Sequence, residues 1–221
     1  MYPKLDYDIE KDFVPLALLA NVPQVLVVNP KSIPGDFKAF LAQLRANPGR
    51  LNYGSAGAGT SHHLAGELFK QQTKTFITHI PYTGAGPALR DLISGQVDMM
   101  FDGLGSSAAH IKGGRVKALM VSGLKRNPAF PEVPCAAELG LPDYTVTTWY
   151  GLWAPKGTPA DVQSRIVDEM HRATATDELK AIWANNGADF GTLTPAQYGS
   201  FVSAEIKRWE AVVKASGAKL D

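Results

Sequence analysis

The 221 residues are enough for one large domain or two small lobes with a sizeable hydrophobic core, and 45% hydrophobic against 19% charged residues excludes a disordered chain. The formal net charge of +1 leaves no strong positive field, so the composition does not favour nucleic acid or an anionic membrane as a partner. The single cysteine, Cys135, excludes an intrachain disulfide and a multi-cysteine metal site.

The beginning of the chain, MYPKLDYDIEKDF, contains no apolar segment of the kind found in signal peptides, and we predict none. The longest uncharged run, residues 13–30, is interrupted by Pro15, Asn21 and Pro23, which does not suit a membrane helix. We interpret this run as two short buried strands separated by a bend at Asn21-Val22-Pro23.

Helices and strands are predicted to alternate from residue 31 to residue 121. Apolar residues at spacings of three and four predict helices that begin near residue 37 and near residue 61, include residues 89–93, and cover residues 107–112. Short apolar segments predict strands at 51–54, 76–80, 97–101 and 116–121. This alternation is typical of a parallel α/β sheet.

The remaining third of the chain has a different character. Residues 127–144 are rich in proline and predict an ordered crossover segment, which a strand at 145–155 follows. Helices are then predicted at about 160–174 and 176–186, with Thr158 as the N-cap of the first. Thr194 and Pro195 have the residue types preferred at the N-cap and first helical positions, so they predict a last helix at about 195–216.

Two loops that join a strand to a helix are rich in glycine and small hydroxyl residues, namely residues 53–63 and 81–87. In open parallel sheets, ligands bind beyond the carboxyl ends of the strands. A helix N-terminus offers unpaired N–H groups and a partial positive charge, and glycine lets the backbone approach a ligand. Two such loops side by side favour a carboxylate site without arginine, whereas a single loop could equally owe its glycines to tight turns.

Sharper motifs are absent from these loops. No lysine follows the glycines, as a phosphate-binding loop requires, and His62 stands where a dinucleotide fingerprint needs its third glycine. The G-x-S-x-G pattern of a nucleophile elbow fails at both Ser55 and Ser61. Adjacent helical residues point about 100° apart, so His62 and His63 do not suit a shared metal. We therefore predict no catalytic residue, no metal and no cofactor.

Two further polar residues are retained as site candidates. His63 falls in the first turn of the helix behind the glycine loop. Asp102 lies at the carboxyl end of a predicted strand, where it could accept a hydrogen bond from a ligand ammonium or hydroxyl, or order a water. The alternative for Asp102 is a turn aspartate that caps the next helix, and the pattern does not decide between the two.

The chain resembles the substrate-binding receptors of tripartite tricarboxylate transporters, the TctC or Bug family. The resemblance extends over essentially the whole chain, and it depends on the combination of motifs rather than on any one of them. The matching stretches are Tyr2-Pro3-Lys4-Leu5, Tyr7-Asp8, Lys11-Asp12-Phe13, residues 53–60, His63 to Phe69, residues 81–88, Gly95-Gln96-Val97-Asp98, Phe101-Asp102, residues 130–134, Gly151 to Pro155 and Gly157-Thr158-Pro159.

The resemblance implies an α/β fold of the type II periplasmic-binding-protein kind, in which two lobes close like a Venus flytrap on a small organic carboxylate. It also implies a periplasmic location and membrane transporter subunits as partners, with no nucleic acid. By the family pattern, residues 21–145 form the second lobe, and residues 1–20 with 146–221 form part of the first. The candidate ligand-binding residues are Ser55, Ala56, Gly57, Gly59, Thr60, His63, Tyr82, Thr83, Gly84 and Asp102.

The chain departs from the family pattern in two places. Family members usually have a further first-lobe segment before the stretch that matches Met1, so we expect an incomplete first lobe whose exposed sheet edge could form a homo-oligomer or a domain swap. Gly103 stands where the family pattern has asparagine. We predict a receptor; the alternative is an isomerase or hydrolase on the same scaffold, with His63 or Asp102 as a base beside Ser55 or Thr60.

Overall fold

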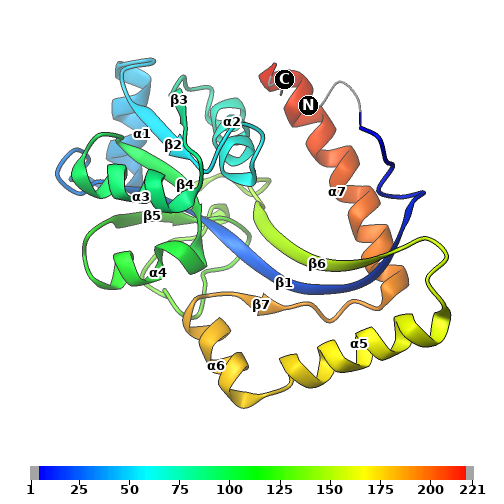
Figure 1. Cartoon of the computed structure of the whole chain (residues 1–221). Coiled ribbons are helices and arrows are strands. Elements are labelled where there is room, and N and C mark those ends of the chain that lie inside the picture. The colour runs from blue at the N-terminus through cyan, green and yellow to red at the C-terminus, as the bar shows by residue number, and fades with distance from the viewer. Residues whose placement is uncertain (1–4, 218–221) are drawn as a thin grey trace.

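The computed structural model describes residues 5–217, so Tyr2-Pro3-Lys4 and the outer ends of the predicted first lobe, residues 1–4 and 218–221, lie outside the described residues. Figure 1 shows the arrangement of the elements. The strands are β1 (Phe13–Val28), β2 (Asn52–Ser55), β3 (Thr78–Pro81), β4 (Met99–Gly103), β5 (Lys117–Val121), β6 (Thr147–Pro155) and β7 (Asp189–Phe190). The helices are α1 (Phe37–Ala46), α2 (Ser61–Thr73), α3 (Ala85–Ser94), α4 (Leu104–Lys112), α5 (Ala160–Thr174), α6 (Asp177–Asn185) and α7 (Pro195–Ser216), with a 3₁₀ turn at Ala137–Leu139.

The main sheet has the strand order β3-β2-β4-β1-β5. Strand β2 is parallel to β3 and β4, whereas β1 is antiparallel to both β4 and β5. The four strands that alternate with helices therefore run in one direction, as predicted, but the expectation of a purely parallel sheet is wrong. The reason is that β1 enters between β4 and β5 from a second sheet rather than through a helical crossover.

Strand β1 is continuous over sixteen residues, so the prediction of two strands with a bend at Asn21-Val22-Pro23 is also wrong. Its first part pairs with β6 from Phe13 to Pro23, and its last part pairs with β4 and β5 from Gln24 onward. The prolines fit because the register shifts next to Pro15, and Pro23 lies where β1 changes partners; irregular positions of this kind tolerate a missing N–H.

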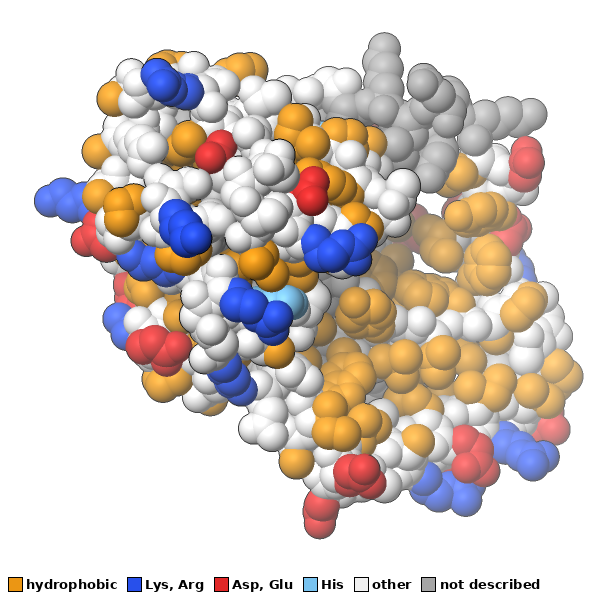
Figure 2. All heavy atoms as spheres, turned by 60° about the vertical axis from the view of Figure 1, so that its left-hand side comes forward, with side chains coloured by type: hydrophobic (Ala, Val, Ile, Leu, Met, Phe, Trp, Pro, Cys, Tyr) orange, Lys and Arg blue, Asp and Glu red, His pale blue; other side chains and the backbone are white. Residues whose placement is uncertain are grey.

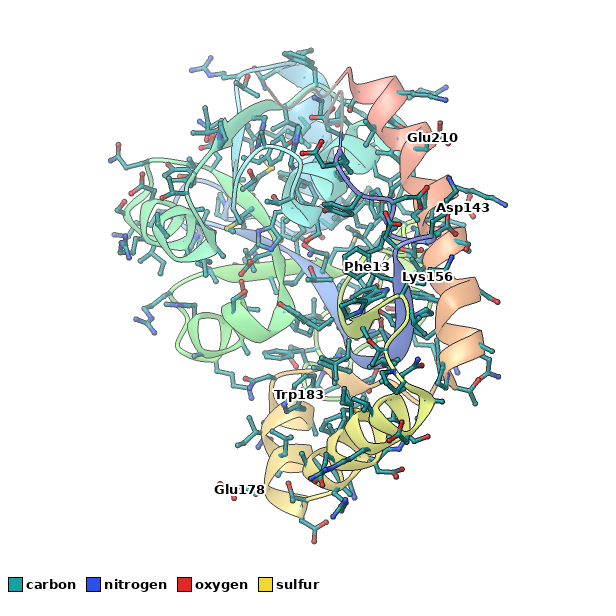
Figure 3. The ribbon with its side chains drawn as sticks, turned by 45° about the vertical axis from the view of Figure 1, so that its right-hand side comes forward. Phe13, Asp143, Lys156, Glu178, Trp183 and Glu210 are labelled. Carbon is teal, nitrogen blue, oxygen red and sulfur yellow. The ribbon has the colours of Figure 1, made fainter. Side chains whose placement is uncertain are left out.

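The second sheet consists of the first part of β1 with β6 and the short β7. Phe13 and Lys156 lie side by side where β1 begins and β6 has ended (Figure 3), and the Lys156 N–H donates to the carbonyl of Asp12. Within the described residues, β6 pairs with β1 alone. Helix α7 packs on this sheet through Tyr198 and Val202.

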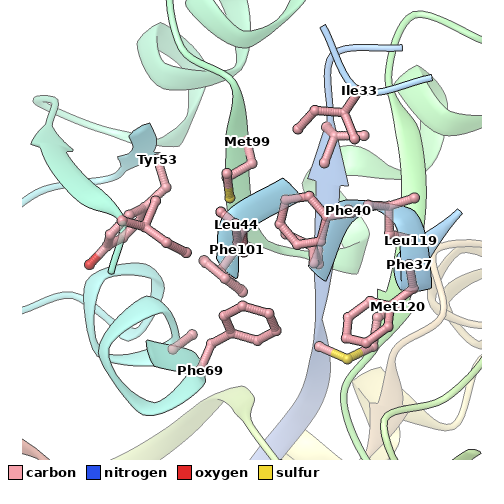
Figure 4. Packing of buried hydrophobic residues seen from close by; sticks show 14 of the residues in the cluster. Ile33, Phe37, Phe40, Leu44, Tyr53, Phe69, Met99, Phe101, Leu119 and Met120 are labelled. Carbon is pink, nitrogen blue, oxygen red and sulfur yellow. The ribbon is translucent and has the colours of Figure 1, made fainter. Parts of the chain in front are cut away.

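Alternation along β1 distributes the core to two faces of the main sheet. Leu26 and Val28 pack with α1, α2 and the aromatic residues of β2 and β4, whereas Val25 and Val27 pack with α3 and α4. Figure 4 shows the first of these clusters, in which Phe40, Phe69 and Phe101 meet. Helices on both faces fix the carboxyl ends of β2 and β3, where the two glycine-rich loops begin.

Most predicted boundaries lie within about two residues of the observed ones, but the predicted cap of α5 is displaced. Pro159 occupies the N-cap position, and the Thr158 hydroxyl donates instead to the carbonyl of Pro155. Thr194 does cap α7, with Gln197 completing a capping box. None of the helices within residues 5–217 is both long and apolar enough to span a membrane.

Candidate functional site

The first glycine loop connects the end of β2 to the start of α2 and has a fixed shape. Gly57 and Gly59 have φ angles of +138° and +79°, which residues with a side chain rarely adopt, and a Cβ on Gly57 would lie 3.2 Å from the carbonyl oxygen of Tyr82. Thr60 is the N-cap of α2; its Oγ1 donates to the Gly57 carbonyl at 2.7 Å and accepts from the His63 N–H at 3.4 Å.

The N–H groups of this loop fall into two sets. Those of Gly57, Gly59 and Thr60 donate within the protein, to Ser55 Oγ, His63 Nδ1 and the Gly57 carbonyl respectively. In the described part of the chain, the N–H groups of Ala56, Ala58, Ser61 and His62 have no protein acceptor. Gly57 and Gly59 therefore shape the loop, while their neighbours and the first turn of α2 hold the donors that a ligand can use.

The second loop, between β3 and α3, is attached to the first. The Tyr82 N–H donates to the Ser55 carbonyl at 3.1 Å. The Tyr82 hydroxyl donates to Asp91 Oδ2 at 2.7 Å, and burial together with this carboxylate raises the pKa of the phenol to about 12. Thr83 is exposed, and Gly84 precedes α3 without a side-chain cap. The two loops thus lie side by side, as predicted, and Thr83 presents an unburied hydroxyl there.

Asp102 is closed to solvent, with an exposed fraction of 0%. Its Oδ2 accepts from the hydroxyls of Ser106 and Ser107 at 2.7 and 2.6 Å, so the carboxylate binds the beginning of α4, which corresponds to the turn-aspartate alternative. Its Oδ1 has no hydrogen bond within the described residues, and His62 Nε2 lies 3.5 Å from it. Burial lowers the pKa of His62 below 6.5 despite this carboxylate.

His79 on β3 is a site residue that the sequence analysis missed. Its Nε2 lies 2.6 Å from Ser55 Oγ, and its ring stacks on that of His63 with centroids 3.9 Å apart and planes 6° from parallel. Tyr53 stacks on the other side of the ring at 4.9 Å. Burial, and secondarily the His63 ring, lowers the pKa of His79 from 6.5 to about 4. No local sequence pattern reports this residue, because it joins the site through the parallel pairing of β2 and β3, which places His79 opposite Tyr53.

The imidazoles border a buried ionic group on α2. Glu67 accepts from the Tyr53 hydroxyl at 2.9 Å and from Lys70 Nζ at 2.8 Å, and its Oε1 lies 3.8 Å from His63 Nε2. Burial lowers the pKa of His63 below 6.5. The neutral form of His63 is therefore favoured at neutral pH.

The start of α2 also contacts the second sheet. Ser61 Oγ and Thr148 Oγ1 are 2.9 Å apart, and the Gln24 side-chain amide lies 2.7 Å from the same Thr148 oxygen. Beside them is a groove of about 510 Å³ whose other walls are largely apolar residues of β6 and α7, among them Trp149 and Trp153. Figure 2 shows hydrophobic side chains gathered on the right-hand part of the face in view, with charged side chains mainly along its lower and outer edges.

Among the described residues, the geometry brings together neither a group of metal ligands nor a nucleophile and base that are open to a substrate. Within residues 5–217, no three His, Cys, Asp or Glu side chains are grouped as a metal site. The closest approach to a catalytic pair is Ser55 with His79, but Ser55 has an exposed fraction of 0% and its hydroxyl is bonded within the loop. What the arrangement offers is backbone donors and hydroxyls at a helix start, which suits an anion.

The chain is similar in fold to solved periplasmic binding proteins, among them BugD, with a TM-score of 0.90 at 29% identity, covering 99% of this chain and 74% of that one. Rpa4515 of R. palustris, solved with adipate, superposes with a TM-score of 0.90 at 34% identity, covering 99% of this chain and 73% of that one. MatC (Rpa3494) from Rhodopseudomonas palustris, solved with bound malate, gives 0.88 at 34% identity, covering 96% and 73%.

Residues 1–218 match the tripartite tricarboxylate transporter family receptor, TctC, and the chain belongs to this family. A relative from Pseudomonas sp. (strain P51), the UPF0065 protein in the tcbD-tcbE intergenic region, is 40% identical over 213 residues. That match covers 96% of this chain but only 63% of the relative. The chain therefore spans less than two thirds of that relative's length.

Proposed function

We propose that this chain binds the carboxylate of a small organic acid against the Ser55–Thr60 loop and the first turn of α2. The observation that supports this most directly is the set of four N–H groups without a protein acceptor at Ala56, Ala58, Ser61 and His62, counted over the described residues. They lie at the positive end of a thirteen-residue helix, where an anion is stabilised without arginine.

The neighbouring loop extends the proposed site. Thr83 and Gly84 lie at the start of α3, and the Tyr82 N–H ties their loop to Ser55. A second polar group on the acid would be bound there. The related structures hold a dicarboxylate, adipate in Rpa4515 and malate in MatC, which supports the same ligand class for this chain. In this proposal Asp102 does not contact the acid; it accepts hydrogen bonds from Ser106 and Ser107 and so fixes the beginning of α4.

The proposed role of the whole protein is to capture the acid in the periplasm and deliver it to membrane transporter subunits; membership of a transporter receptor family supports this role. We also propose that residues 21–145 move as one lobe relative to residues 1–20 and 146–221. The change of β1 partners between Pro23 and Gln24 supports a division three residues after the first of these bounds, because Asn21 to Pro23 still pair with β6.

An isomerase or hydrolase would need a base with access to substrate. His63 Nδ1 is occupied by the Gly59 N–H, and Asp102 has no exposed surface. The Ser55–His79 pair is the remaining candidate, and burial of Ser55 argues against attack on a substrate. Recovery of unaltered acid after incubation with the protein is the expected result, and chemical turnover would favour the enzyme.

The proposed function is tested by titrating adipate and malate calorimetrically into the wild-type protein, Ser61→Asp and Ser61→Asn. A carboxylate at Ser61 suits the first turn of a helix, so Ser61→Asp should fold and melt like wild type or slightly higher. An acid bound about 4 Å away would be repelled by about 4 kcal/mol at an effective dielectric constant of 20, which weakens binding more than 100-fold.

Ser61→Asn is the matched control, because it is similar in size, has no charge and keeps an oxygen near Thr148. It should retain binding within about fivefold of wild type, as expected for the loss of at most one neutral hydrogen bond. Equal affinities of Ser61→Asp and wild type would contradict a site at this helix start. If no organic acid gave a heat of binding with the wild-type protein, the proposed function itself would be refuted.

A further inference from the structure

The loop that holds the free N–H groups is anchored from one side by two stacked imidazoles. His63, in the first turn of α2, binds the loop at Gly59, and His79, on β3, binds it at Ser55. The rings are almost parallel at 3.9 Å, so neither can tilt without displacing the other. The protein therefore holds two ends of a short backbone segment through one pair of side chains.

The contact at Gly59 fixes the protonation state of His63. A backbone N–H can only donate, so His63 Nδ1 must be the acceptor of the 3.0 Å contact and carries no proton. The remaining proton is then on Nε2, on the side of Glu67 Oε1. Burial, which lowers the pKa of His63, agrees with this neutral form.

The contact at Ser55 continues into the loop backbone. Ser55 Oγ lies 2.6 Å from His79 Nε2 and also accepts from the Gly57 N–H at 3.1 Å. His79 thereby fixes the serine hydroxyl that fixes Gly57. With Gly57 and Gly59 both held by side chains, the intervening Ala58 N–H and the adjacent Ala56 N–H are left for another acceptor.

We propose that His63 and His79 are positioning residues of the carboxylate site: they do not contact the acid, but hold the Ser55–Thr60 loop in the conformation that presents its free N–H groups. This inference rests on the proposed function for its ligand. It assigns to His63 a role in the loop's shape rather than in ligand contact, and it adds His79 to the site. Tyr53 stacks on His79, and Glu67, which is paired with Lys70 and bonded to the Tyr53 hydroxyl, lies beside His63.

Isosteric replacements test each ring nitrogen separately. The side-chain oxygen of asparagine takes the place of Nδ1, whereas the glutamine amide takes the place of Nε2. His63→Asn should therefore keep the acceptor for Gly59 and bind adipate or malate within about threefold of wild type, while His63→Gln should bind about tenfold more weakly. For His79 the order reverses, so His79→Gln should retain binding and His79→Asn should lose about tenfold. His171→Gln, on the exposed face of α5, is the control and should change nothing.

A second measurement does not need a ligand. Hydrogen exchange of the Gly59 amide, followed by NMR, should be about tenfold faster in His63→Gln than in wild type and unchanged in His63→Asn. Equal exchange in the two variants, or equal losses of affinity, would overturn the anchoring role. If the exchange pattern holds but wild type binds neither acid, the anchor stands as a structural contact, while the proposed function and the positioning role both fail.

Discussion

Acid should destabilise this protein measurably through one side chain, His79. The pKa of its ring is about 4 in the folded protein, lowered by burial, and 6.5 is its ordinary value. As the pH falls, the His79 ring becomes protonated near pH 6.5 in the unfolded chain but only near pH 4 in the folded protein. The unfolded state therefore binds more protons in this interval, and stability falls as the pH falls through it.

The magnitude follows from the two pKa values. The complete difference corresponds to about 3 kcal/mol, and about 2 kcal/mol of it is expressed at pH 5, where the unfolded ring is mostly protonated and the folded ring mostly neutral. Because His79 is only partly buried, solvent screening reduces the effect, and we expect about 1 kcal/mol. His63, Glu67 and Lys70 face the same ring and set its surroundings.

Urea denaturation at pH 7.5 and pH 5.0 measures this effect, with His79→Gln as the comparison, because glutamine can contact Ser55 but does not titrate. Between the two pH values, the free energy of unfolding of wild type should fall by about 1 kcal/mol more than that of His79→Gln. The comparison of the two proteins also cancels the contributions of His62 and His63, whose pKa values are likewise lowered. Equal losses in the two proteins would refute the reasoning.

The remaining predictions concern packing and capping. Gly151→Ala would place a Cβ 1.8 Å from the buried Tyr198 hydroxyl, so it should lower the free energy of unfolding, measured by urea denaturation, by about 3 kcal/mol. Gly86→Ala is the control, because the space around its Cβ is open; it should be neutral or stabilise the protein by about 0.5 kcal/mol. If both cost the same, the packing argument fails. Thr194→Ala removes the capping box with Gln197 and should lower stability by about 1 kcal/mol in the same assay; no change would show that the cap is dispensable.

Local signals in the sequence predicted the helices well. The residue types at Thr194 and Pro195 located the beginning of α7, and the observed bounds of this helix match the expected ones. Helix α1 likewise ends at the predicted stop before Asn47-Pro48-Gly49. These features depend on neighbours within a few residues, so a single sequence contains what determines them.

Features that depend on distant partners could not be predicted in the same way. The continuity of β1 follows from pairing with β6, more than 120 residues later, which no local pattern reports. His79 becomes a site residue only because β2 and β3 are neighbours. The loop was identified from its glycines, but which of its N–H groups remain free depends on His63 and Ser55 as acceptors.

Strand β1 also imposes an order of assembly during synthesis. Its later half has its partners once β5 is complete at Val121, whereas Phe13 pairs with Pro155 and Ala20 with Phe190. As the chain emerges, the later half of β1 can therefore pair first, whereas the backbone groups of its earlier half stay unpaired until dozens of further residues have followed. While those groups are unpaired, the earlier half of β1 is an open strand edge that can pair with another molecule.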